Sequence, residues 1–362
     1  MRQHFVPKVY LKHFAKKSGN EYVVDVYDIK KRKFFSANTK NICAEKHLYT
    51  LSENSKISND ILFIEKEYAN WIEPLYLKAY EILINNYVSH ISKSQKETIL
   101  IGVFQLYLRN PKHLRETLIY HTNKINQLYK IQKSENKKGL TYLNEDFGFR
   151  EFTLDEIIGS VHSKMKNFFK EEHLVGTRAI VDFHRNAVLE ISNIRDDSEF
   201  ITSDNPLIAE DTLSNEINPL LRSKEFTVPI NKKFLLRIFH DNSMNSDVIY
   251  RRKIPNGSVA SLNHSILRDS SRFLIGDKKA IEDFLKLKND FLDNTSLELK
   301  MDALKQILDL ESASNGNDKA MQLIRHFVQL YEQKGTLTKQ EEYFLFNSIK
   351  EFGRKAKRDK LL

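Results

Sequence analysis

The chain has 362 residues, 41% of them hydrophobic and one of them cysteine (Cys43), so it can bury a large core but can form neither an intrachain disulfide nor a cysteine-based zinc site. Its most apolar stretch, residues 99–108, is too short to cross a bilayer, and its basic N-terminal residues lack the apolar region of a secretory signal, so we expect a cytoplasmic protein without a membrane partner. The net charge of +9 fits a phosphate-rich partner such as nucleic acid, and it also fits a solvated surface.

The N-terminal part of the chain predicts a β-hairpin followed by a helix. Residues Tyr22–Tyr27 read as one strand, and Phe34 begins a second strand after a basic turn. Apolar residues then recur every three or four positions between residues 61 and 82, which is typical of one face of a helix. Pro74 should kink or reset this helix because it lacks a backbone N–H.

A central buried helix is predicted next. Ser94-Gln95-Lys96-Glu97 has the pattern of a capping box, and residues 99–108 are apolar on nearly all sides. The helix should bend or stop near Pro111, after which residues 114–128 continue with helical spacing.

The second half of the chain predicts a change from helix to strand. Residues 133–152 read as a loop, and Thr153 to Glu156 form a second capping box that opens a helix. A hairpin turn is expected at Asn231–Lys233 and a helix near Val259–Leu267. Short apolar runs predict strands at Phe200–Thr202, Phe226–Ile230, Phe234–Phe239, Val248–Ile254 and Phe273–Ile275.

Helical spacing returns after about residue 278. Ser312–Asn317 reads as a linker, Thr338 to Glu341 form a further capping box, and the end of the chain, Arg354–Lys360, is basic. We therefore expect an α+β fold, with a helix-rich body, a small and mostly antiparallel sheet, and a C-terminal helical extension. The expected domains are residues 1–278, helical over about 56–192 and sheet-forming over about 199–278, and residues 279–362.

Two short segments about two hundred residues apart are the strongest candidates for a site. Near the N-terminus, His4 precedes the rigid Pro7, and apolar residues behind it could dock this segment onto the core. Asp204 lies in the segment Thr202–Pro206, where an apolar run ends in a polar turn. Asp204 either caps its own turn or faces a cleft as an acid, a base or a metal ligand.

Two charged residues of the helical half fall on apolar faces. Glu65 lies in the apolar stripe of its helix, so it is either paired with an arginine such as Arg109 or acts as a general base or metal ligand. Arg109 shares a face of the most apolar helix with Gln105, and a buried arginine needs an anion. That anion is an internal carboxylate or a bound phosphate.

Three further residues are candidate substrate-binding groups. Ser203 and Asn205 flank Asp204 and would hold phosphate or substrate, although no glycine elbow marks Ser203 as a nucleophile. Arg251 stands on a predicted strand, where basic residues contact phosphate or simply protect a solvated edge.

The same segments carry a family resemblance. The pattern His4-x-x-Pro7 with Leu11 and Phe14, together with Thr202-Ser203-Asp204-Asn205-Pro206, resembles a bacterial family known as domain of unknown function 4238. Further matches are Glu45–Tyr49, Glu65–Glu73, Arg109–Pro111 and Arg272-Phe273. The resemblance covers roughly residues 1 to 280, implies no established activity, and suggests a setting such as phage defence.

The leading hypothesis is a cytoplasmic hydrolase that acts on nucleic acid or another phosphate-containing substrate. Asp204 and Glu65 would serve as acid and base, or as ligands of a divalent metal such as Mg²⁺. His4 would assist proton transfer and Arg109 would hold a phosphate, so the four side chains should converge on one point. The alternative is a non-catalytic module that binds nucleic acid or a protein, and a weaker third option is an effector acting on a protein or metabolite.

Overall fold

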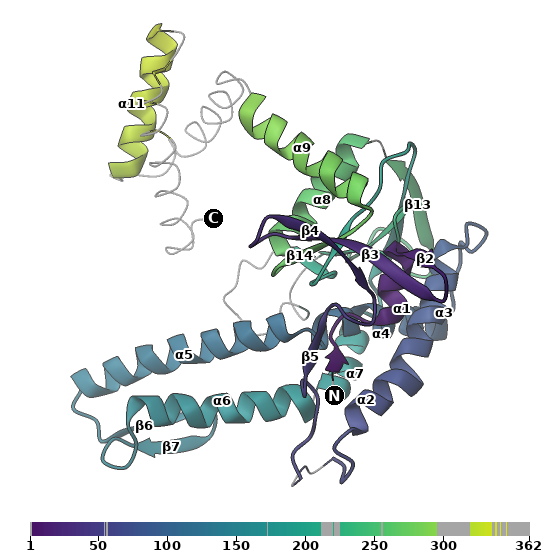
Figure 1. Cartoon of the computed structure of the whole chain (residues 1–362). Coiled ribbons are helices and arrows are strands. Elements are labelled where there is room, and N and C mark those ends of the chain that lie inside the picture. The colour runs from purple at the N-terminus through teal and green to yellow at the C-terminus, as the bar shows by residue number, and fades with distance from the viewer. Residues whose placement is uncertain are drawn as a thin grey trace. The chain divides into compact units, whose positions relative to one another are not determined.

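The fold is α+β, and a computed structural model describes most of the chain (Figure 1). The described residues are 2–294, except 54, 56, 172, 211–219, 221–224 and 255, together with 319–334, 337, 338, 341 and 345. The chain divides into two compact units, Met1–Phe284 and Leu285–Leu362. The predicted linker at 312–317 and the basic end at 354–360 lie outside the described residues.

One mixed sheet is built around a strand that we did not predict, β8 (Val188–Ile194). Its strand order is β10 (Ile208–Glu210), β11 (Glu225–Pro229), β12 (Phe234–Phe239), β8 and β13 (Ile249–Ile254). Neighbouring strands are antiparallel except β8 and β13, which are parallel. We expected the helical part to extend to about residue 192, and this boundary is wrong because β8 begins at Val188. A short apolar run after a helix cannot be assigned by periodicity alone.

A second five-stranded sheet joins the N-terminal hairpin to the segment that holds Asp204. It contains β2 (Lys16–Ser18), β3 (Glu21–Asp28), β4 (Lys33–Asn38), β14 (Phe273–Gly276) and β9 (Thr202–Ser203). The predicted hairpin is confirmed, because β3 and β4 pair antiparallel. β14 lies between β3 and β9 and is antiparallel to both. The strands that we expected to form one small sheet are thus divided between two five-stranded sheets.

The helical stretch around Pro74 is interrupted, as predicted. It runs as α2 (Phe63–Glu67), a π-helical turn η2 (Tyr68–Ile72) and α3 (Glu73–Ile84), and Pro74 lies in the first turn of α3. A proline is tolerated there because the first N–H groups of a helix have no partner within the helix.

Helix α4 (Lys93–Leu108) passes through the core, and its residues 99–108 are all buried, as predicted. Its capping box starts two residues earlier than we expected. Ser92 Oγ accepts from the Gln95 N–H, and Gln95 Oε1 accepts from the Ser92 N–H, so Ser94 is already helical. Helix α7 (His173–His184) packs beside α4.

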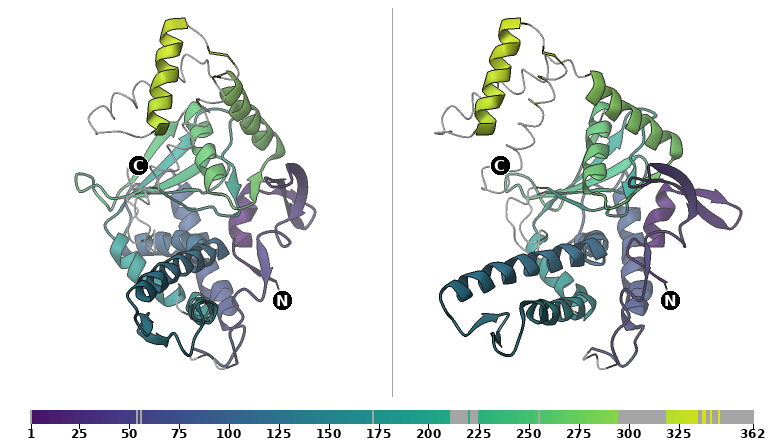
Figure 2. Two further views of the ribbon diagram at one scale, coloured as in Figure 1. Left: turned by 90° about the vertical axis from the view of Figure 1, so that its left-hand side faces the viewer. Right: turned by 60° about the vertical axis from the view of Figure 1, so that its left-hand side comes forward.

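Helices α5 (Pro111–Ser134) and α6 (Leu154–Glu171) run side by side, and a hairpin of β6 (Gly139–Tyr142) and β7 (Glu145–Gly148) joins them (Figure 2). The loop that we expected over 133–152 therefore contains two strands. Leu143 and Asn144 form the hairpin turn with φ angles of 50° and 61°, and leucine is a rare choice at such a position. The capping box of Thr153 and Glu156 is confirmed.

The remaining helices follow the predicted order. Helix α8 (Asn256–Asp269) precedes β14, and α9 (Lys278–Asn294) follows it. In the second unit, α11 (Lys319–Lys334) belongs to a small apolar cluster with Leu337 and Leu345, and the Thr338–Glu341 capping contacts are present. Among the described residues, no helix has the length and apolarity needed to cross a membrane.

The N-terminal segment is docked against the rest of the first unit. Strand β1 (Arg2–His4) pairs with β5 (Ala44–Lys46), and the short helix α1 (Lys8–Leu11) and the 3-10 turn η1 (Lys12–Phe14) follow it. Tyr10, fully buried in α1, places its hydroxyl 2.9 Å from the Pro229 carbonyl oxygen and 2.6 Å from Thr202 Oγ1. One hydroxyl thus joins the N-terminal helix to both sheets.

We predict that Tyr10→Phe lowers the free energy of unfolding by about 1–3 kcal/mol, because two buried oxygens lose their partner. Urea unfolding followed by circular dichroism measures this change. The matched control is Tyr87→Phe, since Tyr87 is 97% exposed and its substitution should change stability by less than about 0.5 kcal/mol. Equal effects of the two substitutions would contradict the docking role of Tyr10.

Candidate ligand pocket

A cavity of about 770 Å³ opens where the N-terminal segment meets the Asp204 turn. Its walls come from the β1 region, the chain before β5, the start of α5, the turn after β9 and the start of β14. The lining residues are Arg2, Phe5, Lys30, Phe35, Ala37, Asn41, Ile42, Cys43, Ala44, Glu45, Asn110, Arg115, Asp204, Ser271, Arg272 and Phe273. Segments from both ends of the first unit are therefore needed to form this pocket.

Four basic side chains belong to the pocket lining: Arg2, Lys30, Arg115 and Arg272. Arg2 is held by the carbonyl oxygens of Asn41 and Ala44, at 3.1 and 3.2 Å. Two of the others contact acids, since Arg115 lies 3.8 Å from Glu45 and Arg272 lies 2.7 Å from Asp28. Against these four cations stand three acids, Glu45 and Asp204 in the lining and Asp28 behind Arg272, so the pocket keeps a small excess of positive charge, which favours anions.

Aromatic side chains form one side of the pocket. Phe35 and Phe273 meet edge to face with ring centroids 5.9 Å apart, and Phe35 is 43% exposed. The Arg272 guanidinium lies 4.7 Å from the centre of the Phe273 ring. The pocket therefore offers a flat apolar surface next to a cation, which suits a planar ring that carries negative charge.

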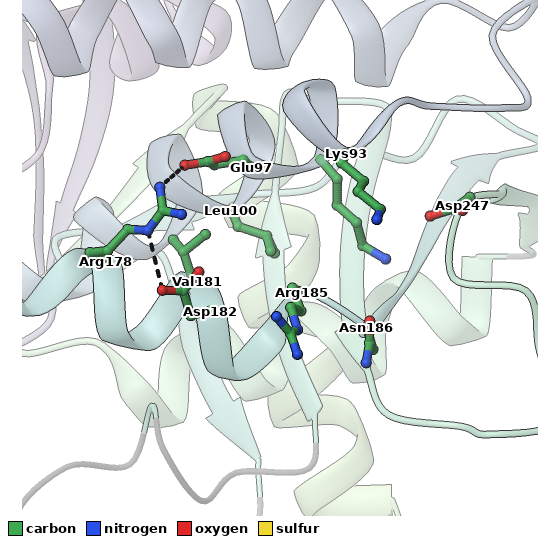
Figure 3. A pocket seen from close by; sticks show the side chains of 10 residues that line it. Lys93, Glu97, Leu100, Arg178, Val181, Asp182, Arg185, Asn186 and Asp247 are labelled. Carbon is green, nitrogen blue, oxygen red and sulfur yellow. Dashed lines mark hydrogen bonds and ion pairs between the residues drawn. The ribbon is translucent and has the colours of Figure 1, made fainter.

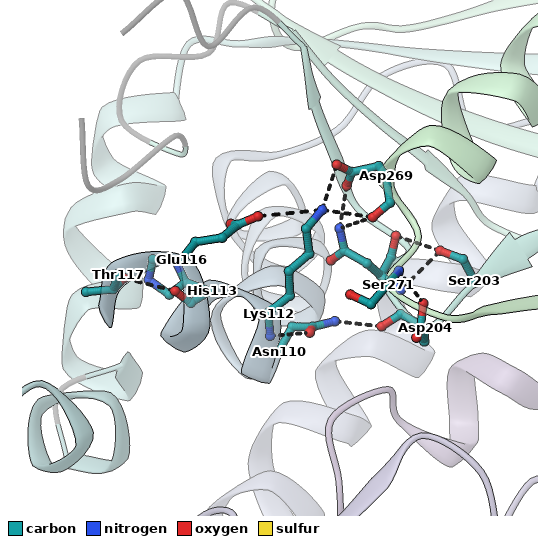
Figure 4. A network of polar contacts seen from close by, with 10 residues as sticks. Asn110, Lys112, His113, Glu116, Thr117, Ser203, Asp204, Asp269 and Ser271 are labelled. Carbon is teal, nitrogen blue, oxygen red and sulfur yellow. Dashed lines mark hydrogen bonds and ion pairs between the residues drawn. The ribbon is translucent and has the colours of Figure 1, made fainter. Parts of the chain in front are cut away.

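Asp204 is the buried acid of the pocket and is 5% exposed. Its carboxylate accepts the Ser271 N–H at 2.9 Å, and its main-chain oxygen accepts from Asn110 Nδ2 at 2.8 Å (Figure 4). Burial raises the pKa of Asp204, although N–H groups at the start of β14 oppose this shift. Asp204 thus anchors β14, and its own turn is made by a different side chain.

Ser203 makes that turn, because its Oγ donates to the Asn205 carbonyl oxygen at 2.9 Å and accepts the Asn205 N–H at 3.0 Å. Asn205 Nδ2 donates to the Asp269 carboxylate at the end of α8. Lys112 Nζ reaches the same carboxylate at 2.8 Å, so the turn, α5 and α8 form one polar network (Figure 4). The Ser203 hydroxyl and the Asn205 amide nitrogen therefore serve contacts within the fold, whereas the buried Asn205 Oδ1 has no hydrogen-bond partner among the described residues.

Arg109, 1% exposed, lies immediately before the Asn110 that holds Asp204. Its guanidinium donates to the His4 carbonyl oxygen and stacks on Tyr68 with 3.9 Å from the carbon to the ring centre. The carboxylate nearest to it is Glu73, at 3.7 Å. The internal carboxylate that Arg109 requires is thus Glu73, where we had suggested Glu65.

Glu65 is half-buried in α2, and its Oε2 has no hydrogen-bond partner among the described residues. Burial raises the pKa of Glu65, nearby Arg109 lowers it, and Glu73 raises it further. His4 is 8% exposed, and its Nε2 donates to the Lys40 carbonyl oxygen at 3.1 Å. Burial lowers the pKa of His4 to about 4, so its ring is neutral near pH 7.

The structure therefore sorts the predicted site residues into two neighbouring groups. Asp204 lines the pocket, whereas the side chains of His4, Glu65 and Arg109 do not. Arg109 and Asn110, which are adjacent in sequence, connect the two groups through His4 and Asp204.

Arg251 lies elsewhere, on β13. Its guanidinium donates to the carbonyl oxygens of Leu83, Asn85 and Val88 at the end of α3, at 2.9, 2.7 and 3.3 Å. These contacts explain a half-buried arginine at this position without a phosphate.

A divalent metal held jointly by Asp204 and Glu65 does not fit these residues. Asp204 is hydrogen-bonded to the start of β14, and Glu65 lies in the cluster of Arg109 and Glu73. Within the described ranges, no group of three or more His, Cys, Asp or Glu side chains is arranged to hold a metal ion.

The pocket contains residues that sequence reasoning did not select as site residues. Arg2, Lys30, Cys43 and Arg115 carry no pattern of their own, because they come from separate segments that only the fold assembles. For other lining residues a signal was present, because the segments that carried the family resemblance contain Glu45, Asn110, Arg272 and Phe273.

The comparisons identify the family to which the chain belongs. A family model described as "Protein of unknown function (DUF4238)" matches residues 2–280, and the chain belongs to this family. The match spans both sheets, the helical body and every residue that lines the pocket. No curated protein and no solved structure matches the chain significantly.

We predict that Arg109→Ala lowers the free energy of unfolding by about 3–5 kcal/mol, because it removes a fully buried side chain and leaves the half-buried Glu73 and the His4 carbonyl oxygen without their cation. Chemical unfolding measures the loss. Arg178→Ala is the control, since this exposed arginine forms surface ion pairs and should cost about 0–1 kcal/mol. A stable Arg109→Ala protein would refute the structural role.

Because the pKa of Asp204 is raised in the folded state, the stability of the protein should depend on pH through this group. The folded state holds this proton more tightly than the unfolded chain, so ionisation of Asp204 costs stability as pH rises above about 4. We therefore expect the stability of Asp204→Asn, relative to the unmodified protein, to increase between pH 3.5 and pH 7. Unfolding in urea at several pH values measures the difference, and a decrease over this range would contradict the raised pKa.

Proposed function

We propose that the pocket binds a nucleotide unit of a nucleic acid, and that the protein is a hydrolase acting on nucleic acid or a related phosphate-containing substrate. The observation that supports this proposal is the combination of four basic side chains and an aromatic edge around one cavity. Arginine pairs with phosphate oxygens through two parallel hydrogen bonds, and bases stack on aromatic rings whatever their sequence.

Asp204 is the acid or base of this proposal. It is buried and it lines the pocket. Its pKa is raised toward the pH at which an enzyme works, where a carboxyl group can both accept and donate a proton. Arg115 and Arg272 would hold the phosphate next to it, in the role that we first gave to Arg109. A serine nucleophile is not part of the proposal, because both hydrogen-bonding directions of the Ser203 hydroxyl serve its own turn.

The second candidate is a non-catalytic module that binds nucleic acid. One observation favours it: Asp204 accepts the Ser271 N–H, which is a structural role that requires no turnover. Phage defence stays the proposed setting for either function, on the family resemblance. We also propose that residues 279–362 form a helical extension to a domain of residues 1–278, which α11 supports.

The binding test compares two basic residues of helix α5. Arg115 lines the pocket and is 52% exposed, whereas Lys130 is exposed on the same helix and does not line it. We expect Arg115→Ala to weaken binding of a labelled single-stranded oligonucleotide at least tenfold, or about 1.4 kcal/mol, in fluorescence anisotropy. Lys130→Ala removes the same charge and should change the affinity less than twofold. Equal effects would place binding outside the pocket.

The same DNA and RNA, incubated with and without Mg²⁺ or Mn²⁺, separate the two candidates. Cleavage that Asp204→Asn reduces at least a hundredfold while binding persists supports the hydrolase, since general acid–base catalysis contributes about 10²–10⁴-fold. Binding sensitive to salt and to Arg115→Ala, with no cleavage under any condition, supports the non-catalytic module.

A further inference from the structure

A second cavity, of about 470 Å³, lies at the N-terminal end of α4 (Figure 3). Its walls come from the first turns of α4, the second half of α7 with the two residues that follow it, and Asp247, two residues before β13. The lining residues are Lys93, Lys96, Glu97, Leu100, Arg178, Val181, Asp182, Arg185, Asn186 and Asp247. The volume falls within the range of about 300–1,000 Å³ that small-molecule sites occupy.

The charges of this cavity separate into two groups. Arg178 is neutralised on one side, because it contacts Glu97 and also Asp182 at 3.2 Å (Figure 3). The other group is formed by Lys93, Lys96 and Arg185 with a single acid, Asp247. Within the described part of the chain, no carboxylate lies within 4.0 Å of these three cations. This side of the cavity therefore has an excess of positive charge.

Lys96 is the most informative of these cations. It is 3% exposed, and among the described residues its ammonium group donates one hydrogen bond, to the Ser246 carbonyl oxygen at 2.6 Å. An ammonium group can donate three hydrogen bonds, so the site has donors to spare. Burial lowers the pKa of Lys96 to about 8, which shows that the fold alone compensates its charge poorly.

The start of α4 adds to the positive charge on this side of the cavity. Ser92 caps this helix, and Lys93 is its first residue, so the positive end of the helix dipole lies at the cavity. Leu100 and Val181 add an apolar side to the lining, which an isolated inorganic ion would leave unused. The ligand that fits best has a dianionic group and a small organic part.

We propose that this cavity is a second binding site, for a small phosphate monoester of sugar-phosphate size, with Lys93, Lys96 and Arg185 contacting the phosphate. The site is separate from the ligand pocket. Lys93 begins α4, whereas Asn110 of the pocket follows its end, and a helix of 16 residues is about 24 Å long. One small ligand cannot occupy both places, so this inference stands without the proposed function.

The test uses ribose 5-phosphate, which carries a dianion but no aromatic base for the first pocket, and ribose as its uncharged counterpart. Isothermal titration should show binding of ribose 5-phosphate and none of ribose. Arg185→Gln and Lys96→Met should each weaken binding at least tenfold. Arg115→Ala, which changes the first pocket, should leave the affinity within twofold.

Arg185 is exposed, so Arg185→Gln remains informative if the substitution of the buried Lys96 prevents folding. Three results would overturn the proposal: no binding of ribose 5-phosphate, equal binding of ribose, or unchanged affinity in Arg185→Gln. Loss of binding in Arg115→Ala would instead assign the sugar phosphate to the first pocket and also overturn the second site.

Discussion

The buried guanidinium of Arg109 is the contact on which the arrangement of the first unit depends. It fastens the N-terminal segment through the His4 carbonyl oxygen, and it lies against Tyr68 and Glu73 of the helical body. Its own carbonyl oxygen accepts from the Tyr49 hydroxyl. A buried cation must be compensated from several sides, and the compensating groups here come from the N-terminal segment and from the helical stretch that contains Tyr68 and Glu73. The charge therefore fixes where these segments meet.

The pocket is a consequence of that arrangement. Asn110 follows Arg109, caps helix α5 through its side-chain oxygen, and uses its amide to hold the main chain of Asp204. Asp204 in turn accepts from the start of β14, next to Arg272 and Phe273 of the pocket lining. Buried polar groups of this kind act together, because each one orients the next. The positions of the basic side chains in the pocket lining thus depend on these buried contacts.

Local chemistry made much of the fold predictable from the sequence. Alternating and helical spacings located the β3–β4 hairpin, α4 and β14, and the proline at position 74 marked the break before α3. Strand β8 was missed because a short apolar run has no distinctive period, and the β6–β7 hairpin was missed because Leu143 hides its turn. Strand β8 and the β6–β7 hairpin both depend on contacts with other segments, which the sequence of one segment does not reveal.

The candidate site was predictable only in part, for a related reason. Asp204 could be selected because a polar turn after an apolar run is visible in one segment. Arg2, Lys30 and Arg115 could not, since each is an ordinary surface cation until the fold brings it to the same cavity. The sequence likewise suggested Glu65 as a partner of Arg109, and only the geometry shows that Glu73 is the carboxylate nearest to it.

The span of the pocket lining also limits when the site can exist. Its residues extend from Arg2 to Phe273, and β14 is the last of its segments to be made. A chain growing on the ribosome lacks the Ser271 N–H that holds Asp204 until residue 271 has been translated. The N-terminal segment is therefore made well before the residues with which it forms the pocket. A nascent chain that ends before residue 273 therefore lacks part of the pocket lining, and the pocket can form only after the start of β14 has been translated.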